Sequence, residues 1–151
     1  MSRVLEFAAL PALVGQELAL SAWFAVGQTR IDAFADATED RQWIHTDPER
    51  CVRESPFGGT VAHGFLTLSL LPAMLESALR IEGMRMGLNY GLNKVRFPSP
   101  LPAGSRVRGR WTLGAVEPVA GGLQLTWEVA VEREGADKPV CAAEFLVRCY
   151  P

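Results

Sequence analysis

The chain has no excess of positive charge: 15 Lys and Arg residues stand against 17 Asp and Glu residues, for a net charge of −2. Nucleic-acid binding depends on cationic side chains that displace phosphate counterions, so nucleic acid is excluded as the main partner. Cysteine is scarce as well. Cys51, Cys141 and Cys149 are odd in number and match no CxxC spacing, which argues against a disulfide framework or a zinc site and predicts reduced thiols in a cytoplasmic protein.

The sequence also lacks an apolar run of the ~20 residues that a membrane-spanning helix needs, so no membrane partner is expected. The apolar N-terminal stretch is interrupted by Glu6 and Glu17, and Arg3 is its one basic residue. It therefore predicts a short helix leading into a strand rather than a signal peptide. Internal repeats and linkers are absent from the sequence, and its length predicts one domain over residues 1–151.

An acid and a histidine flank a predicted turn in ATEDRQWIHTDP, residues 37–48. Asp40 precedes His45 by five positions. In a helix this spacing turns ~500°, and in a strand it places the two side chains on opposite faces, so neither regular structure would bring them together. Apolar spacing predicts a helix over 30–38. Thr46 or Asp47 as the cap, followed by Pro48, predicts a second helix that begins just after His45. A turn between the two helices would bring the side chains of Asp40 and His45 together.

The longest apolar segment is FLTLSLLPAMLESALR, residues 65–80. It predicts one long helix, kinked at Pro72 and surrounded by protein on nearly every face. The period then changes to two in 105–111, 123–132 and 140–150, which predicts half-buried antiparallel strands with a hairpin turn at Gly121-Gly122. We therefore expect an α+β fold in which an antiparallel sheet wraps one long helix, the hot-dog arrangement.

Two separated motifs agree with this fold. The segments TEDRQWIHTDPERC (38–51) and GGTVAHGFLTLSLL (58–71) together resemble the MaoC-like dehydratases, the (R)-specific enoyl-CoA hydratases, and in particular their nodulation protein N-like branch. NYGLNKVRFPSPLPAGSRVRGRW (89–111) is similar to that branch too. The family pattern Asp-x-Asn-Pro-aliphatic-His is kept at Asp40, Ile44 and His45, whereas Gln42 and Trp43 replace its Asn and Pro.

The resemblance implies a homodimeric hydratase without cofactor or metal that interconverts trans-2-enoyl-CoA and (R)-3-hydroxyacyl-CoA. The substrate would be an acyl-CoA thioester, with a carrier-protein thioester as the alternative. Asp40 and His45 would hold a water molecule and move its proton, although both also fit structural roles at helix ends. The backbone N–H of Gly64, at the start of the long helix, would donate to the thioester oxyanion.

Six further residues are weaker candidates for substrate contact: Gln42, Trp43, His63, Asn93, Lys94 and Arg96. His63 fits a second acid/base group or a structural hydrogen bond in its loop, and Trp43 fits an acyl-chain contact or core packing. Lys94 and Arg96 share a strand face by alternation, where they would meet CoA phosphates or solvent.

Two other functions stay open. A hot-dog thioesterase would hydrolyse the thioester, often with a carboxylate on the long helix, where this chain offers only Glu76 near the end. A non-catalytic acyl-CoA-binding subunit is favoured by Gln42 and Trp43 but disfavoured by the presence of both Asp40 and His45.

The strands predicted over 105–113 and 123–132 contain no Pro, and their outward charges are mixed in sign. We expect two copies of the chain to pair through such strands as a homodimer.

Overall fold

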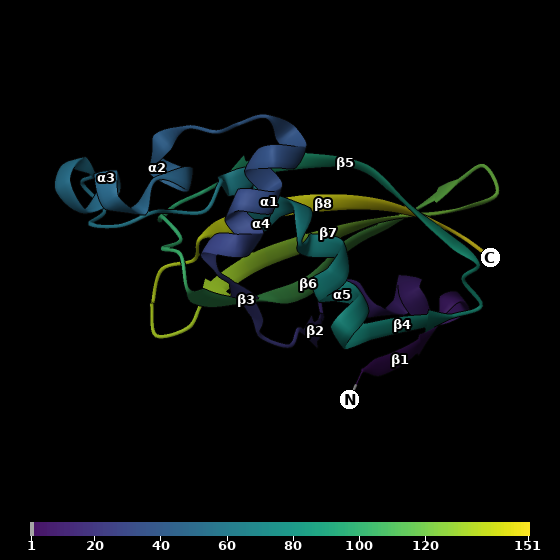
Figure 1. Ribbon diagram of the computed structural model, residues 1–151. Helices are drawn as coiled ribbons and strands as arrows, with labels where there is room; N and C mark the ends of the chain where they lie inside the picture. Colours follow the sequence, from purple (N-terminus) through teal and green to yellow (C-terminus); the bar gives the residue numbers. More distant parts are fainter. Residues whose placement is uncertain (1) are drawn as a thin grey trace.

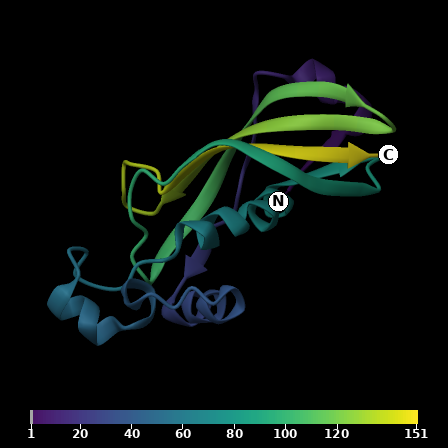
Figure 2. The same cartoon turned by 90° about the horizontal axis from the view of Figure 1, so that it is seen from above.

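The computed structural model describes residues 2–151, which form a curved antiparallel sheet that passes around two consecutive helices (Figures 1 and 2). The strands are β1 (Arg3–Glu6), β2 (Glu17–Leu20), β3 (Phe24–Val26), β4 (Leu79–Glu82), β5 (Met86–Arg96), β6 (Ser105–Val119), β7 (Gly122–Arg133) and β8 (Cys141–Tyr150). The helices are η1 (Phe7–Leu13, 3-10), α1 (Gln28–Thr38), α2 (Trp43–Thr46), α3 (Pro48–Glu54), α4 (Gly64–Ser69) and α5 (Leu71–Ala78).

The main sheet has the strand order β2-β6-β7-β8-β5, with β3 also pairing with β6. Its central hairpin, β6 and β7, turns at Gly121, whose φ of 80° is the left-handed conformation that glycine adopts without strain. The alternation predicted for these strands is confirmed. Trp111 and Trp127 are fully buried, whereas Arg108 and Arg110 point outward and both pair with Glu132.

The buried face of the sheet packs against α4 and α5. Trp111 and Trp127 meet edge to face there, with ring centroids 6.0 Å apart. Gly109 makes room for this pair, because a Cβ at that position would lie 2.6 Å from Nε1 of Trp111. The predicted arrangement, a sheet wrapped around an apolar helical core, is therefore present.

The prediction of one long helix over 65–80 is wrong: α4 and α5 are separate helices that meet at Leu70. Pro72 has no N–H to continue the hydrogen-bond ladder, and the N–H of Leu70 is shared between the carbonyls of Leu66 and Thr67. The last residues of the predicted helix belong to β4, which pairs in parallel with β1. No helix among residues 2–151 is long and apolar enough to span a membrane.

Helices α1, α2 and α3 gather beyond one end of the sheet (Figure 2). As predicted, α3 begins at Pro48, and the Asp47 carboxylate accepts the N–H of Arg50 at 3.0 Å. Before it, α2 is a single turn that contains His45. The helix start at Asp47-Pro48 thus places α3 directly after the single turn of α2, and both lie to one side of α1 and α4 (Figure 1).

Candidate active site

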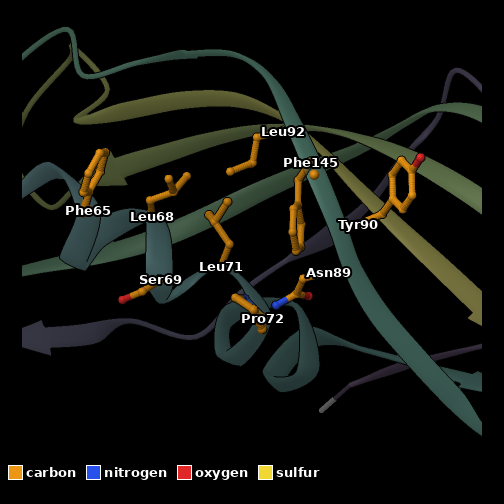
Figure 3. Close-up of a pocket in the computed structure, with 10 residues that line it drawn as sticks. Phe65, Leu68, Ser69, Leu71, Pro72, Asn89, Tyr90, Leu92 and Phe145 are labelled. Carbon is orange, nitrogen blue, oxygen red and sulfur yellow. The ribbon is translucent and has the colours of Figure 1, made fainter. Parts of the chain in front are cut away.

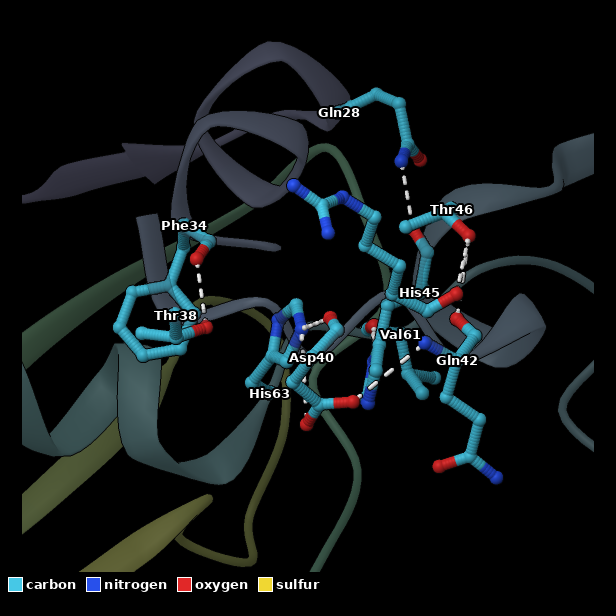
Figure 4. A network of polar contacts seen from close by, with 10 residues as sticks. Gln28, Phe34, Thr38, Asp40, Gln42, His45, Thr46, Val61 and His63 are labelled. Atoms are coloured by element: carbon cyan, nitrogen blue, oxygen red, sulfur yellow. Dashed lines mark hydrogen bonds and ion pairs between the residues drawn. The ribbon is translucent and has the colours of Figure 1, made fainter. Parts of the chain in front are cut away.

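Asp40, His45 and His63 converge at one point (Figure 4). Glu39 ends α1 in a left-handed conformation with φ 63°, which turns the chain so that Asp40 faces the residues of α2. One nitrogen or oxygen atom from each of the three side chains lies within 4.8 Å of the other two. The turn between the helices therefore does what the sequence predicted: it brings Asp40 and His45 together.

The His45 ring is buried and held in one orientation. Its Nδ1 lies 2.6 Å from the backbone oxygen of Val61. A carbonyl can only accept a hydrogen bond, so Nδ1 carries the proton of the neutral ring and Nε2 keeps a free lone pair. The backbone of α2 is fixed in turn by Gln28, whose Nε2 donates to the His45 carbonyl at 2.7 Å and whose Oε1 accepts the Thr60 hydroxyl at 2.5 Å.

His63 lies beneath His45 and is 3% exposed. The two rings are stacked, with centroids 3.8 Å apart and planes inclined by 22°. Nε2 of His63 donates to the backbone carbonyl of Asp40 at 2.9 Å, and the Phe34 ring packs on His63 at a centroid distance of 4.9 Å. His63 therefore joins the loop before α4 to the turn that carries Asp40.

The Asp40 carboxylate remains open to solvent, with 55% of the side chain exposed. Its Oδ2 lies 4.0 Å from Nε2 of His63, and its Oδ1 faces the N–H of Gln42 at 3.5 Å. These contacts are long, so the carboxylate oxygens keep lone pairs for a further donor such as water.

An acid and two histidines are also a common ligand set for transition metals. Here the two imidazoles are stacked, so their in-plane lone pairs run side by side rather than meeting at one point. A shared ion would require one ring to rotate out of the stack and His63 to release the Asp40 carbonyl. The geometry fits hydrogen bonding and proton transfer better than joint coordination of a metal.

Gly64 follows His63 and is the first residue of α4, so its N–H has no intrahelical acceptor. Phe97 lies over the glycine, and a Cβ at position 64 would come within 2.9 Å of the Phe97 ring. Gly64 and the acid/base cluster open into a cavity of about 440 Å³, within the range of ligand sites. The cavity is lined by Phe34, Thr38, Asp40, His45, His63, Gly64, Phe65 and Phe97.

A second cavity, of about 400 Å³, adjoins the first between the helices and β5 (Figure 3). It is mostly apolar, with Leu68 and Leu71 on the helical side and Leu92 on the strand. Phe65 lines both cavities and is 68% exposed. The Phe65 ring therefore borders both the acid/base cluster and an apolar cavity.

Of the weaker candidates, the structure brings His63 into this cluster and leaves the others outside it. Gln42 caps α2 and is exposed, and its side chain points away from Asp40 (Figure 4). Trp43 is half-buried, with the Arg50 guanidinium 4.2 Å from its ring centroid. Both lie outside the set of residues that line the cavity of Asp40 and His45.

Asn93, Lys94 and Arg96 lie on β5 as expected, but the alternation predicted for Lys94 and Arg96 is interrupted. The pairing of β5 with β8 shifts between Asn93 and Arg96, and Lys94 has a left-handed φ of 51°. Lys94 pairs with Glu144 at 3.4 Å on the outer face of the sheet. It is thus directed away from the cavity of Asp40 and His45.

Two residues of the site were not among the sequence candidates. Gln28 supports α2 from the first turn of α1, and Phe97 covers Gly64 from the loop after β5. A polar residue at a helix start and an aromatic residue beside a Pro are common, and neither pattern carries a signal for this role. The Val61 group that orients His45 is a backbone carbonyl, which every residue has, so the residue type at position 61 could not have predicted this contact.

Fold and site together define a protein in which an antiparallel sheet wraps two helices and an acid/base cluster faces an apolar cavity. Residues 9–134 match the family described as MaoC like domain. The chain is 54% identical over 144 residues to Nodulation protein N of Rhizobium leguminosarum bv. viciae, covering 94% of this chain and 89% of that protein. It is 49% identical over 140 residues to 3-hydroxyacyl-thioester dehydratase Z of Mycobacterium tuberculosis, covering 92% of each.

Solved structures agree on the fold. The (R)-hydratase from A. caviae involved in PHA biosynthesis superposes with a TM-score of 0.74 at 23% identity, over 91% of this chain and 96% of that one. A monoamine oxidase regulatory protein from Archaeoglobus fulgius has a TM-score of 0.78 at 21% identity, over 100% of this chain and 99% of that one. The chain belongs to the MaoC-like dehydratase family, and the hot-dog fold is confirmed apart from its divided helix.

Proposed function

We propose that this protein catalyses the reversible hydration of a trans-2-enoyl-CoA thioester to the (R)-3-hydroxyacyl-CoA thioester, as an (R)-specific enoyl-CoA hydratase. The observation that carries the proposal is the convergence of Asp40 and His45 at one cavity, with Nδ1 of His45 engaged by the Val61 carbonyl so that Nε2 is left for a water molecule. A ligand atom of each side chain lies within 4.8 Å of the other, which is close enough for one water to hydrogen-bond both at ~2.8 Å.

In this mechanism the bound water donates its hydrogens to the Asp40 carboxylate and to Nε2 of His45. As the water oxygen bonds to C3, one of its protons passes to the pair, and the C2–C3 π electrons move toward the thioester oxygen. The pair then returns a proton to C2, which restores its starting state and completes the addition of water. In this scheme the Asp40/His45 pair both accepts and returns the proton, so neither transfer calls on a cofactor or metal.

The negative charge on the thioester oxygen requires a donor, and we assign this role to the N–H of Gly64. As the first residue of α4, directly after His63, this N–H lies beside the acid/base pair and has no acceptor within the helix. In other enzymes, loss of one oxyanion donor raises the barrier by ~3–4 kcal/mol. The acyl chain would then pass Phe65 into the apolar cavity of Figure 3.

Thioester chemistry and (R) configuration are supported by the relatives. One is named a 3-hydroxyacyl-thioester dehydratase at 49% identity, and the structural neighbour from A. caviae is an (R)-hydratase. A dehydratase and a hydratase catalyse the same equilibrium from opposite sides, so both names fit one site. The buried free thiols of Cys51, Cys141 and Cys149 fit a reducing compartment such as the cytoplasm.

The active form would be a homodimer, but through a different strand from the ones first expected. β6 and β7 are paired on both sides, so strands 105–113 and 123–132 offer no free edge. β5 is paired on one side with β8, and it exposes Leu88, Tyr90 and Leu92 next to Phe65. A long apolar edge strand of this kind is suited to symmetric pairing with a second copy.

A thioesterase is the competing enzyme, and the position of Glu76 weighs against it. Glu76 lines a different cavity, beside Ile81 and Val147, away from His45. The test is an assay with crotonyl-CoA that follows both the enoyl absorbance and free thiol. Hydration predicts loss of absorbance without thiol, a thioesterase releases thiol, and a non-catalytic binding subunit changes neither.

A further inference from the structure

On the basis of the proposed function, we infer that His63 is a positioning residue that sets the relative placement of Asp40, His45 and the Gly64 N–H. His63 contacts or adjoins all three: it donates to the Asp40 carbonyl, stacks on His45 and is bonded to Gly64. These groups come from two segments of the chain, 40–45 and 63–64. A single side chain therefore connects the acid, the base and the oxyanion donor.

The bond from His63 to Asp40 fixes the backbone rather than the carboxylate. Asp40 lies in the turn between α1 and α2, and its exposed side chain makes only long contacts of 3.5 Å and 4.0 Å. The 2.9 Å bond from Nε2 of His63 to its carbonyl is the short contact that anchors this residue. Without this bond, only the turn between α1 and α2 would determine the direction in which the carboxylate faces the cavity.

The stack fixes the base. Nδ1 of His45 is held by the Val61 carbonyl, but one hydrogen bond leaves the ring free to rotate about that axis. The face of His63 at 3.8 Å blocks this rotation on one side, and Phe34 supports His63 from another direction. The lone pair on Nε2 of His45 is thereby directed at a constant point in the cavity.

His63 is itself poorly placed to exchange protons with substrate. Its Nε2 is engaged with the Asp40 carbonyl, and its Nδ1 is enclosed with no hydrogen-bond partner among residues 2–151. Since a carbonyl only accepts, Nε2 carries the proton and Nδ1 does not. His45 and His63 are thus held as opposite tautomers, Nδ1–H and Nε2–H respectively.

The experiment compares His63→Gln with His63→Met in the crotonyl-CoA assay. Gln presents an N–H at about the distance of Nε2 and can donate to the Asp40 carbonyl, whereas Met fills similar space without a donor. We expect His63→Met to lower kcat ~10²-fold, the cost of a misplacement of about 1 Å, with KM within about twofold of wild type. We expect His63→Gln to recover most of that loss, with both variants melting at similar temperatures.

Full activity in His63→Met would overturn the inference. Equal losses in the Met and Gln variants would overturn the role of the hydrogen bond to the Asp40 carbonyl, because a restored donor would then restore nothing. Absence of hydration by the wild-type protein would instead refute the proposed function and leave the tautomers to be tested directly. The chain contains two histidines, so ¹⁵N-histidine labelling resolves each ring by NMR even if a variant fails to fold. Opposite tautomers are expected, and the same tautomer in both rings would contradict the inference.

Discussion

The rings of His45 and His63 lie face to face at 3.8 Å, yet their N–H groups serve two different carbonyls, those of Val61 and Asp40. Both rings are buried, and each uses one nitrogen for structure. The difference lies in the other nitrogen: Nδ1 of His63 is enclosed, whereas His45 lines the cavity with its Nε2 unbonded. We therefore assign His45 to the proposed chemistry and His63 to its support.

The first prediction concerns the acid and the base. Asp40→Asn removes the charge but keeps the shape, and His45→Asn keeps a donor near Nδ1 for the Val61 carbonyl while removing Nε2. Each change should lower kcat by ~10²–10⁴, the range for loss of a general acid/base group. Steady-state kinetics with crotonyl-CoA measures the effect, and thermal melting controls for folding. Turnover above about a tenth of wild type in either variant would reject that residue's role.

The second prediction distinguishes the effect of the Gly64 N–H from the effect of adding a side chain at that position. Pro suits this position, because it is the first residue of α4 and the preceding His63 is extended, with φ −61° and ψ 136°. Gly64→Ala is the matched control: it adds the same Cβ against Phe97 but keeps the N–H. We expect Gly64→Pro to lower kcat at least ~10²-fold below Gly64→Ala, with both folds verified by circular dichroism. Equal rates in the two variants would remove Gly64 as the oxyanion donor.

The third prediction concerns assembly through β5. The wild-type protein should sediment as a dimer of 33.0 kDa, twice the 16.5 kDa of one chain. Leu92→Lys places two like charges at the proposed edge and should shift the protein to monomer at micromolar concentration. Leu20→Lys is the control, since Leu20 lies on the other edge strand, β2, at 43% exposure against 40% for Leu92. Sedimentation equilibrium decides: a fully active wild-type monomer, or dissociation by Leu20→Lys instead, would contradict this interface.

Some features of the fold and the site are determined by neighbouring residues and could be predicted from the sequence, whereas others could not. The Asp47-Pro48 start of α3, the period-two strands and the meeting of Asp40 with His45 depend on caps, turns and alternation, all of which adjacent residues determine. The stack of His45 on His63 and the cover of Phe97 over Gly64 join segments 18 and 33 residues apart. These two contacts depend on the paths of the loops between the segments, and the pattern of residue types does not predict those paths.

Strand order is a second property that pattern alone could not supply. Alternation identified β6 and β7 as half-buried, but their neighbours in the sheet are set by packing around α4 and α5, which leaves β5 as the longer of the two edge strands. The break at Leu70 is similar. Pro72 predicted a kink, and whether a kink or two helices result depends on which carbonyls the flanking N–H groups reach.

The fourth prediction follows from two buried thiols. Burial raises the pKa of Cys141 and of Cys149 from the ordinary value of 9.0 to about 11. Between these values the unfolded thiols have lost protons that the folded thiols still hold, so the unfolding free energy should fall as pH rises. Urea denaturation at pH 8 and pH 10 measures the loss. The double variant Cys141→Ala/Cys149→Ala should lose less stability over the same interval, and an equal loss would show that these thiols are not responsible.

Addition of water to C3 of an intact thioester is measured most directly by the fate of ¹⁸O from labelled water. The wild-type protein is incubated with crotonyl-CoA in H₂¹⁸O, and the products are separated and weighed by mass spectrometry. We predict 3-hydroxybutyryl-CoA that carries the label on its hydroxyl group and retains its CoA. Label in free crotonate with release of CoA would identify a thioesterase, and recovery of unlabelled crotonyl-CoA would identify a binding protein; either result would contradict the account.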